Sequence, residues 1–159
     1  MKTVVILRGI PGSGKSTAAK KSYPTALVCS ADHFHMRKTG EMDASGQPIK
    51  VYDWKAENQG MAHARCLAKF KDALDAGEEL VVVDNTNIKR GEYQKYIEYA
   101  WFAGYEVWIH EVRVTTEDQI AICVQRNVHR VPEDTIRRMA SSFKDSDTKG
   151  IHRLISQSP

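Results

Sequence analysis

Long apolar runs are missing from this sequence of 159 residues. A membrane-spanning helix needs about 20 consecutive apolar residues. The apolar stretch from Val4 to Leu7 is also too short for the core of a secretory signal, and it leads directly into glycines. We therefore expect no membrane partner.

Cysteine is scarce as well, and the count of three is odd. Cys29, Cys66 and Cys123 are irregularly spaced, which argues against a disulfide framework and favours reduced thiols in a cytoplasmic protein. Each is expected to lie in the core. The net charge of +3 is too small to indicate a nucleic-acid partner by itself, and the length fits one domain.

Apolar runs alternate with helical patterns along the chain. This alternation predicts an α/β fold with a mainly parallel sheet covered by helices on both faces. The expected strands are 3–7, 26–29, 80–84 and 105–114, and the expected helices are 15–22, 55–76, 91–103, one beginning in "TTEDQ" (115–119) and one beginning near Pro132. The stretch "TGEMDASGQPIKVYDW" (39–54) has turn residues and no clear period, which indicates a loop or flexible cover.

The most specific motif is "GIPGSGKS" (9–16), which fits the phosphate-loop pattern GxxxxGK[ST] between a strand and a helix. In such a loop, backbone N–H groups and the helix N-terminus face phosphate oxygens. Lys15 would reach the β- and γ-phosphates of a nucleoside triphosphate, and the Ser16 hydroxyl would bind Mg²⁺. The candidate nucleotide-binding residues here are Gly9, Pro11, Gly12, Ser13, Gly14, Lys15, Ser16 and Thr17.

A second motif, "LVVVDNTN" (80–87), is an apolar strand that ends in short polar residues. Asp84 has the position of the acid that holds Mg²⁺ in phosphate-loop proteins. Asn85 and Thr86 are candidates for hydrogen bonds to substrate or water, although a turn or helix cap explains the asparagines equally well.

A third motif, "RNVHRVPEDTIRRM" (126–139), contains two arginines four residues apart. Arg126 and Arg130 would share one helix face if the helix continued that far, and Pro132 imposes a boundary soon after. Paired guanidinium groups suit a lid that closes over a triphosphate. A solvated basic helix end is the alternative.

One carboxylate, Asp32, follows a short strand in "CSADHF" (29–34). A carboxylate at this place can cap a helix, bind Mg²⁺ or accept the proton of the group that receives a phosphate. The residues alone leave these three roles open.

Together, "GIPGSGKST", "SADHF", "VVVDNTN" and "RNVHRVPEDTIRRM" resemble the 5′-hydroxyl polynucleotide kinase family, which includes the kinase half of the phage end-healing enzymes and the kinase-like domain of Nedd4-binding protein 2. The resemblance covers most of residues 1–144. It implies the phosphate-loop nucleoside triphosphate hydrolase/kinase fold, with a four-stranded parallel sheet, a tunnel-like site and a lid at about 115–142. In this family the aspartate that corresponds to Asp32 activates the 5′-hydroxyl, and the lid arginines correspond to Arg126 and Arg130.

Two positions depart from the family pattern. Phage members have an arginine that contacts the acceptor phosphate where this chain has His35, which is therefore the candidate acceptor contact here. Those members also carry the acid beside the threonine of "TN", where this chain has Asn85, with its acid one residue earlier at Asp84.

The predicted function is transfer of the γ-phosphate of ATP, GTP or another nucleoside triphosphate, with Mg²⁺, to the 5′-hydroxyl end of RNA or DNA. The alternatives are a kinase of another hydroxyl acceptor, such as a nucleoside or modified base, and a nucleotide-dependent binding module without transferase activity. We expect a kinase domain over 1–144 and a tail over 145–159. The "DSDT" at 145–148 is expected to be a hydrated loop or frayed terminus, because too little chain follows it for a phosphatase.

Overall fold

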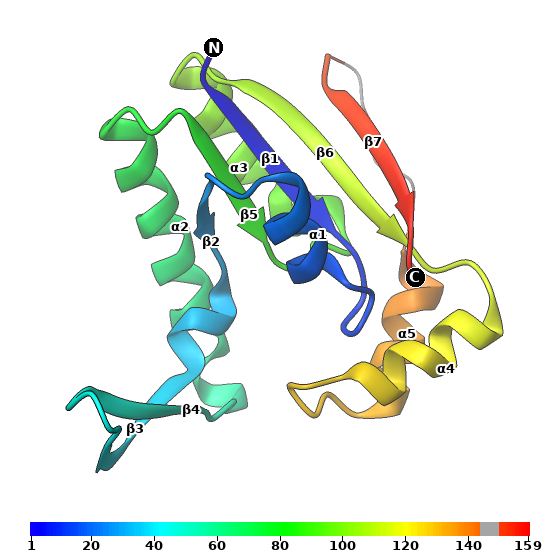
Figure 1. Cartoon of the computed structure of the whole chain (residues 1–159). Coiled ribbons are helices and arrows are strands. Elements are labelled where there is room, and N and C mark those ends of the chain that lie inside the picture. Colours follow the sequence, from blue (N-terminus) through cyan, green and yellow to red (C-terminus); the bar gives the residue numbers. More distant parts are fainter. Residues whose placement is uncertain (144–149) are drawn as a thin grey trace.

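A parallel sheet of five strands forms the centre of the molecule (Figure 1). The computed structural model describes residues 1–143 and 150–159. The spatial order is β2-β5-β1-β6-β7, and every adjacent pair is parallel. The bounds are Thr3–Arg8 for β1, Leu27–Cys29 for β2, Leu80–Asp84 for β5, Glu106–Arg113 for β6 and His152–Gln157 for β7. The predicted parallel sheet is confirmed, but the expected number of four strands is wrong.

Helices cover both faces of this sheet, as predicted. One face packs on α2 and α3 through the side chains of Val4, Ile6 and their neighbours, and the other packs on α1 through Val5 and Leu7. The helices are α1 (Lys15–Ser22), α2 (Gln59–Asp75), α3 (Arg90–Phe102), α4 (Glu117–Arg126) and α5 (Glu133–Ser142), with short 3-10 helices η1 (Ala31–His35) and η2 (Ala56–Asn58). Alternate residues of β1 therefore face opposite layers, which explains why this strand is apolar from Val4 to Leu7.

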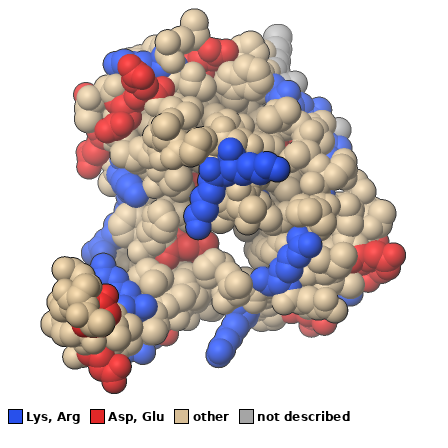
Figure 2. All heavy atoms as spheres, in the orientation of Figure 1, with Lys and Arg blue, Asp and Glu red and all other residues tan. Residues whose placement is uncertain are grey.

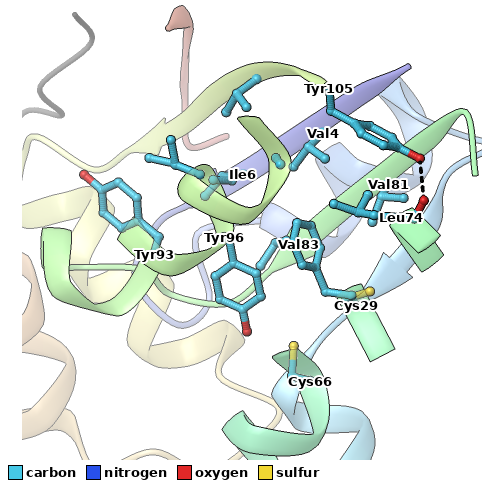
Figure 3. Packing of buried hydrophobic residues seen from close by; sticks show 14 of the residues in the cluster. Val4, Ile6, Cys29, Cys66, Leu74, Val81, Val83, Tyr93, Tyr96 and Tyr105 are labelled. Atoms are coloured by element: carbon cyan, nitrogen blue, oxygen red, sulfur yellow. Dashed lines mark hydrogen bonds between the residues drawn. The ribbon is translucent and has the colours of Figure 1, made fainter. Parts of the chain in front are cut away.

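The larger core lies between the sheet and the α2–α3 pair. Figure 3 shows Val4, Ile6, Val81 and Val83 among the aromatic side chains of this layer. All three cysteines are free and buried, so their predicted core location is confirmed. In the described part of the chain, no helix combines the length and the apolar character needed to cross a bilayer.

A β-hairpin projects from the sheet where a loop was expected over 39–54. Its strands are β3 (Met36–Met42) and β4 (Pro48–Tyr52), which pair antiparallel with each other (Figure 1). The loop prediction was wrong because nearly all of these side chains are exposed or only partly buried. A strand without a buried face needs no alternation of apolar and polar residues, so periodicity cannot detect it.

The C-terminal segment also differs from expectation. "DSDT" (145–148) lies outside the described residues, but His152–Gln157 forms β7, a strand that was not expected, along β6. The interpretation of "DSDT" as a hydrated loop or frayed terminus stays a prediction. Beyond β7, the Ser158 hydroxyl donates a hydrogen bond to the Ser13 carbonyl at 3.0 Å. The domain boundary at residue 144 stays a prediction, and β7 lies beyond it.

Candidate functional site

The glycine-rich loop connects β1 to α1 at the carboxyl end of the sheet. Gly12 and Gly14 have φ values of 78° and 91°, a region that favours glycine. A Cβ on Gly12 would lie 2.1 Å from the carbonyl oxygen of Cys123 in α4, so the lid helix packs directly on the loop. Gly14 is the N-cap of α1 and supplies no side-chain cap, which leaves N–H groups at the helix start for an anion.

Lys15, Ser16 and Asp84 meet beside this loop. The Ser16 hydroxyl donates a hydrogen bond to Asp84 Oδ2 at 2.8 Å, and Asp84 is only 8% exposed. Both side chains offer hard oxygen donors of the type that Mg²⁺ prefers, so the pair fits a magnesium ion that is completed by phosphates and water. Burial lowers the pKa of Lys15, and the attraction of Asp84 and of Asp32 partly opposes this shift. An anionic phosphate would add to that attraction.

The polar residues after β5 make hydrogen bonds within the protein. Asn85 Oδ1 accepts a hydrogen bond from the Ala31 backbone at 2.9 Å, and its Nδ2 donates to Cys66 Sγ at 3.6 Å. The Thr86 carbonyl accepts from the Gly9 backbone at 3.0 Å. Asn87 Nδ2 donates to the Leu7 carbonyl at 2.7 Å. These residues join β5 to the phosphate loop and to the segment that carries Asp32.

Asp32 lies in the first turn of η1, close to the end of β2. The cap of this turn is Ser30, whose hydroxyl accepts a hydrogen bond from the Asp32 backbone at 3.3 Å. The Asp32 carboxylate is therefore not the helix cap, and its side chain is 48% exposed. Its charge also acts on Lys15, which places the predicted base on the same side of the molecule as the phosphate loop.

Two side chains that the sequence did not point to contact Asp32. The Tyr52 hydroxyl donates to Asp32 Oδ1 at 3.2 Å, and His129 Nε2 lies 3.5 Å from Asp32 Oδ2. The rings of Tyr52 and His129 also pack together, with centroids 4.2 Å apart. Tyr52 ends the β3–β4 hairpin and His129 belongs to the loop between α4 and α5, so the hairpin and the lid meet over Asp32.

His35, the candidate acceptor contact, is buried with only 4% exposure. Its Nε2 lies 3.0 Å from Gln59 Oε1, and its ring packs near the rings of Tyr52 and Trp54, with centroids 6.0 and 6.3 Å away. The buried imidazole therefore packs against the rings of Tyr52 and Trp54.

The two lid arginines do not share a helix face, because α4 ends at Arg126 with Asn127 as its C-cap. Arg130 follows in a left-handed conformation with φ 53°. Both side chains are exposed, and among the described residues no hydrogen bond or ion pair engages either guanidinium group. Figure 2 shows Lys and Arg side chains around the hollow between the hairpin and the lid.

The starts of α4 and α5 are as predicted. Thr116 caps α4 by accepting a hydrogen bond from the Gln119 backbone at 3.2 Å, and Pro132 is the N-cap of α5. Cys123 and Ile136 pack these two helices against Ile10 of the phosphate loop. The two lid helices therefore share a small apolar core with the phosphate loop.

Residues 4–145 match the family model described as an AAA domain. The chain belongs to this family. Among curated relatives of this AAA domain, NEDD4-binding protein 2 of Homo sapiens is 26% identical over 144 residues, which cover 89% of this chain and 8% of the relative. The chain thus spans a small part of that protein's length.

Solved structures share the fold of this AAA domain. A gluconokinase from Sinorhizobium meliloti aligns with a TM-score of 0.61 and 17% identity over 98% of this chain and 82% of that protein. Kti12 from Chaetomium thermophilum, solved in complex with ADP-AlF3, aligns with a TM-score of 0.58 and 14% identity over 97% of this chain and 88% of that protein. This AAA domain therefore carries a phosphate-loop motif between β1 and α1 and shares its fold with these two proteins.

Proposed function

We propose that this domain is a kinase that transfers the γ-phosphate of ATP, or of another nucleoside triphosphate, to the 5′-hydroxyl end of RNA or DNA. The observation that carries the proposal is the Asp32 carboxylate, which is half-exposed, acts on the Lys15 charge and is flanked by aromatic rings. A 5′-hydroxyl is a poor nucleophile and needs a base within reach, unlike a nucleotide phosphate, which is already anionic.

Each site residue has a role in this proposal. The loop N–H groups and Lys15 bind the β- and γ-phosphates, and Ser16 with Asp84 would hold Mg²⁺, which neutralises phosphate charge when it is bound. Asp32 takes the proton of the acceptor hydroxyl as its oxygen attacks the γ-phosphorus. Arg126 and Arg130 offset the charge that develops on the transferred group.

Aromatic side chains around Asp32 support a nucleic-acid end as the acceptor. Tyr52 and His129 lie directly against the carboxylate, and Trp54 is half-exposed next along the chain, where its indole N–H donates to Gln59 Oε1 at 3.0 Å. Flat rings beside the acceptor position suit the stacking of unpaired bases. Buried, free cysteines are in keeping with the reducing cytoplasm.

A second candidate is phosphorylation of a small hydroxyl compound. It is favoured by the burial of His35 against Gln59, because a buried imidazole does not offer the acceptor phosphate the contact that an arginine makes in the phage kinases. An acceptor without a neighbouring phosphate would not need that contact.

Transfer of labelled γ-phosphate from ATP or GTP to a panel of acceptors tests the proposal. The panel contains 5′-hydroxyl RNA and DNA oligonucleotides, free nucleosides and gluconate. We expect labelled oligonucleotides and no labelled gluconate. Labelling of nucleosides or gluconate without oligonucleotides would support the second candidate, and nucleotide binding without any transfer would indicate a binding module.

The lid arginines should affect turnover more than binding. Arg126→Ala and Arg130→Ala are each expected to lower kcat by about ten- to hundredfold while the nucleotide Kd changes less, because their charge matters most in the transition state. Steady-state kinetics and nucleotide titration measure the two quantities. Arg138→Ala on α5 is the control, since it removes the same charge from an exposed lid position. Equal losses in binding and turnover would make these arginines simple phosphate anchors.

A further inference from the structure

Asp32 has two carboxylate oxygens, and each faces a different part of the molecule. Oδ1 accepts the hydrogen bond of the Tyr52 hydroxyl at 3.2 Å, whereas Oδ2 faces His129 Nε2 at 3.5 Å. Tyr52 comes from the hairpin and His129 from the lid loop. The two contacts are therefore made by two different elements of the fold.

The contact between Tyr52 and Asp32 is held in place by neighbouring side chains. The Tyr52 ring packs edge-on against the buried His35 ring, and His35 is in turn held by Gln59. Burial, with the charge and the hydrogen bond of Asp32, raises the pKa of Tyr52, so its hydroxyl remains a donor at neutral pH. A donor with a fixed ring and a fixed proton keeps one carboxylate oxygen in a single position.

The His129 contact is weaker and more exposed. Its 3.5 Å separation exceeds the usual hydrogen-bond distance of about 2.7–3.2 Å, and the side chain is 36% exposed. Among the described residues, His129 Nδ1 has no hydrogen-bond partner although it is buried. The imidazole therefore covers Oδ2 through one long polar contact, and its ring is held by packing on Tyr52.

From this difference, we infer that Tyr52 is a positioning residue that holds Asp32 by Oδ1, and that Oδ2, once His129 moves aside, is the oxygen that receives the acceptor proton. This inference rests on the proposed function. It adds two residues to the site: Tyr52, which orients the base, and His129, which occupies the acceptor's place in the free protein.

In the proposed transfer, one bond to the γ-phosphorus forms and one breaks. The acceptor oxygen forms a bond to the γ-phosphorus as its proton passes to Asp32 Oδ2. The bond between the γ-phosphorus and its bridging oxygen breaks, and that oxygen leaves with the nucleoside diphosphate. Asp32 then returns the proton to solvent. Tyr52 keeps its own proton throughout, because Oδ1 remains its acceptor.

Tyr52→Phe tests the positioning role, because it removes the hydroxyl and keeps the ring that packs on His129 and His35. We expect kcat on a 5′-hydroxyl oligonucleotide to fall about tenfold, the size of one hydrogen bond to a charged group. The acceptor KM and the nucleotide Kd should stay within about twofold of wild type. Tyr99→Phe is the matched control, since the Tyr99 hydroxyl also donates to an aspartate, Asp75, at 2.9 Å, but away from the site.

A merely structural role for Tyr52 predicts a different pattern. Loosening of the hairpin would raise the acceptor KM or lower the melting temperature, with little change in kcat at saturation. That result, or a kcat equal to that of Tyr99→Phe, would overturn the positioning role.

His129→Ala tests the second half of the inference. If the imidazole competes with the acceptor for Oδ2, its removal should lower the acceptor KM several-fold. A raised KM would show that His129 binds the acceptor instead and would overturn its role as a competitor.

Failure of the proposed function would be seen separately. If wild-type protein labels only nucleosides or gluconate, the nucleic-acid acceptor is wrong, and the Tyr52→Phe comparison is read on the acceptor that is labelled. Hydrogen–deuterium exchange of residues 127–131 needs no transfer at all. We expect faster exchange in Tyr52→Ala and unchanged exchange in Tyr52→Phe, because the ring holds the lid loop. Equal exchange in all three proteins would contradict the contact between hairpin and lid.

Discussion

Lys15→Ala is expected to abolish measurable phosphate transfer and to leave the fold intact. The substitution removes the one loop ammonium that would reach the β- and γ-phosphates, a loss of about 10²–10³ or more in kcat for a preorganised charge of this kind. Asp84 and Asp32 would then face the triphosphate without the positive charge that they now attract. Transfer of labelled γ-phosphate, with circular dichroism to confirm folding, measures the effect.

Lys20→Ala is the control for this experiment. Lys20 lies exposed in the last turn of the same helix and carries the same charge, so it reports any general effect of lowering the positive charge of α1. Near-full activity of Lys15→Ala would place the nucleotide elsewhere on the protein. A parallel loss in both variants would assign the effect to overall charge.

The sheet and its helices were predictable because their sequences face a common core. β1 and β5 are apolar over most of their length, β6 has buried apolar residues at alternate positions 107 and 109, and α4 begins at a threonine cap. The β3–β4 hairpin and β7 were not predictable in this way. Both have mainly exposed or partly buried side chains, so the hydrogen bonds of a neighbouring strand define them and the apolar pattern does not.

The residues of the candidate site also differ in how far the sequence predicts them. Lys15, Ser16 and Asp84 follow from a short motif and a strand end, where local sequence determines the geometry. Tyr52 and His129 reach Asp32 from positions 20 and 97 residues away, through a hairpin and a loop that have no periodic signal. The prediction that Arg126 and Arg130 share a helix face was wrong for a related reason. The chain leaves α4 at Asn127, five residues before the proline that the sequence offered as the boundary.

Asp32→Asn is expected to lower transfer to a hydroxyl acceptor by about 10²–10⁴. Asparagine keeps the shape of the side chain and an oxygen that can accept from Tyr52, but it cannot take the acceptor's proton. Stability should change little, because the contact with His129 is exposed and is worth less than about 1 kcal/mol, and because Ser30 caps the turn. Nucleotide binding should survive, since Asp32 is not part of the phosphate loop.

The measurement is kcat on a 5′-hydroxyl oligonucleotide together with the melting temperature in the presence of nucleotide. Asp72→Asn, an exposed aspartate on α2, controls for the loss of one surface carboxylate. An Asp32→Asn protein that is both stable and active would refute the base assignment, because neither Tyr52 nor His129 could then be orienting or covering a catalytic oxygen. A stable, nucleotide-binding and inactive protein would separate the two functions of this end of the sheet, with the loop binding the phosphates and Asp32 activating the group that receives one.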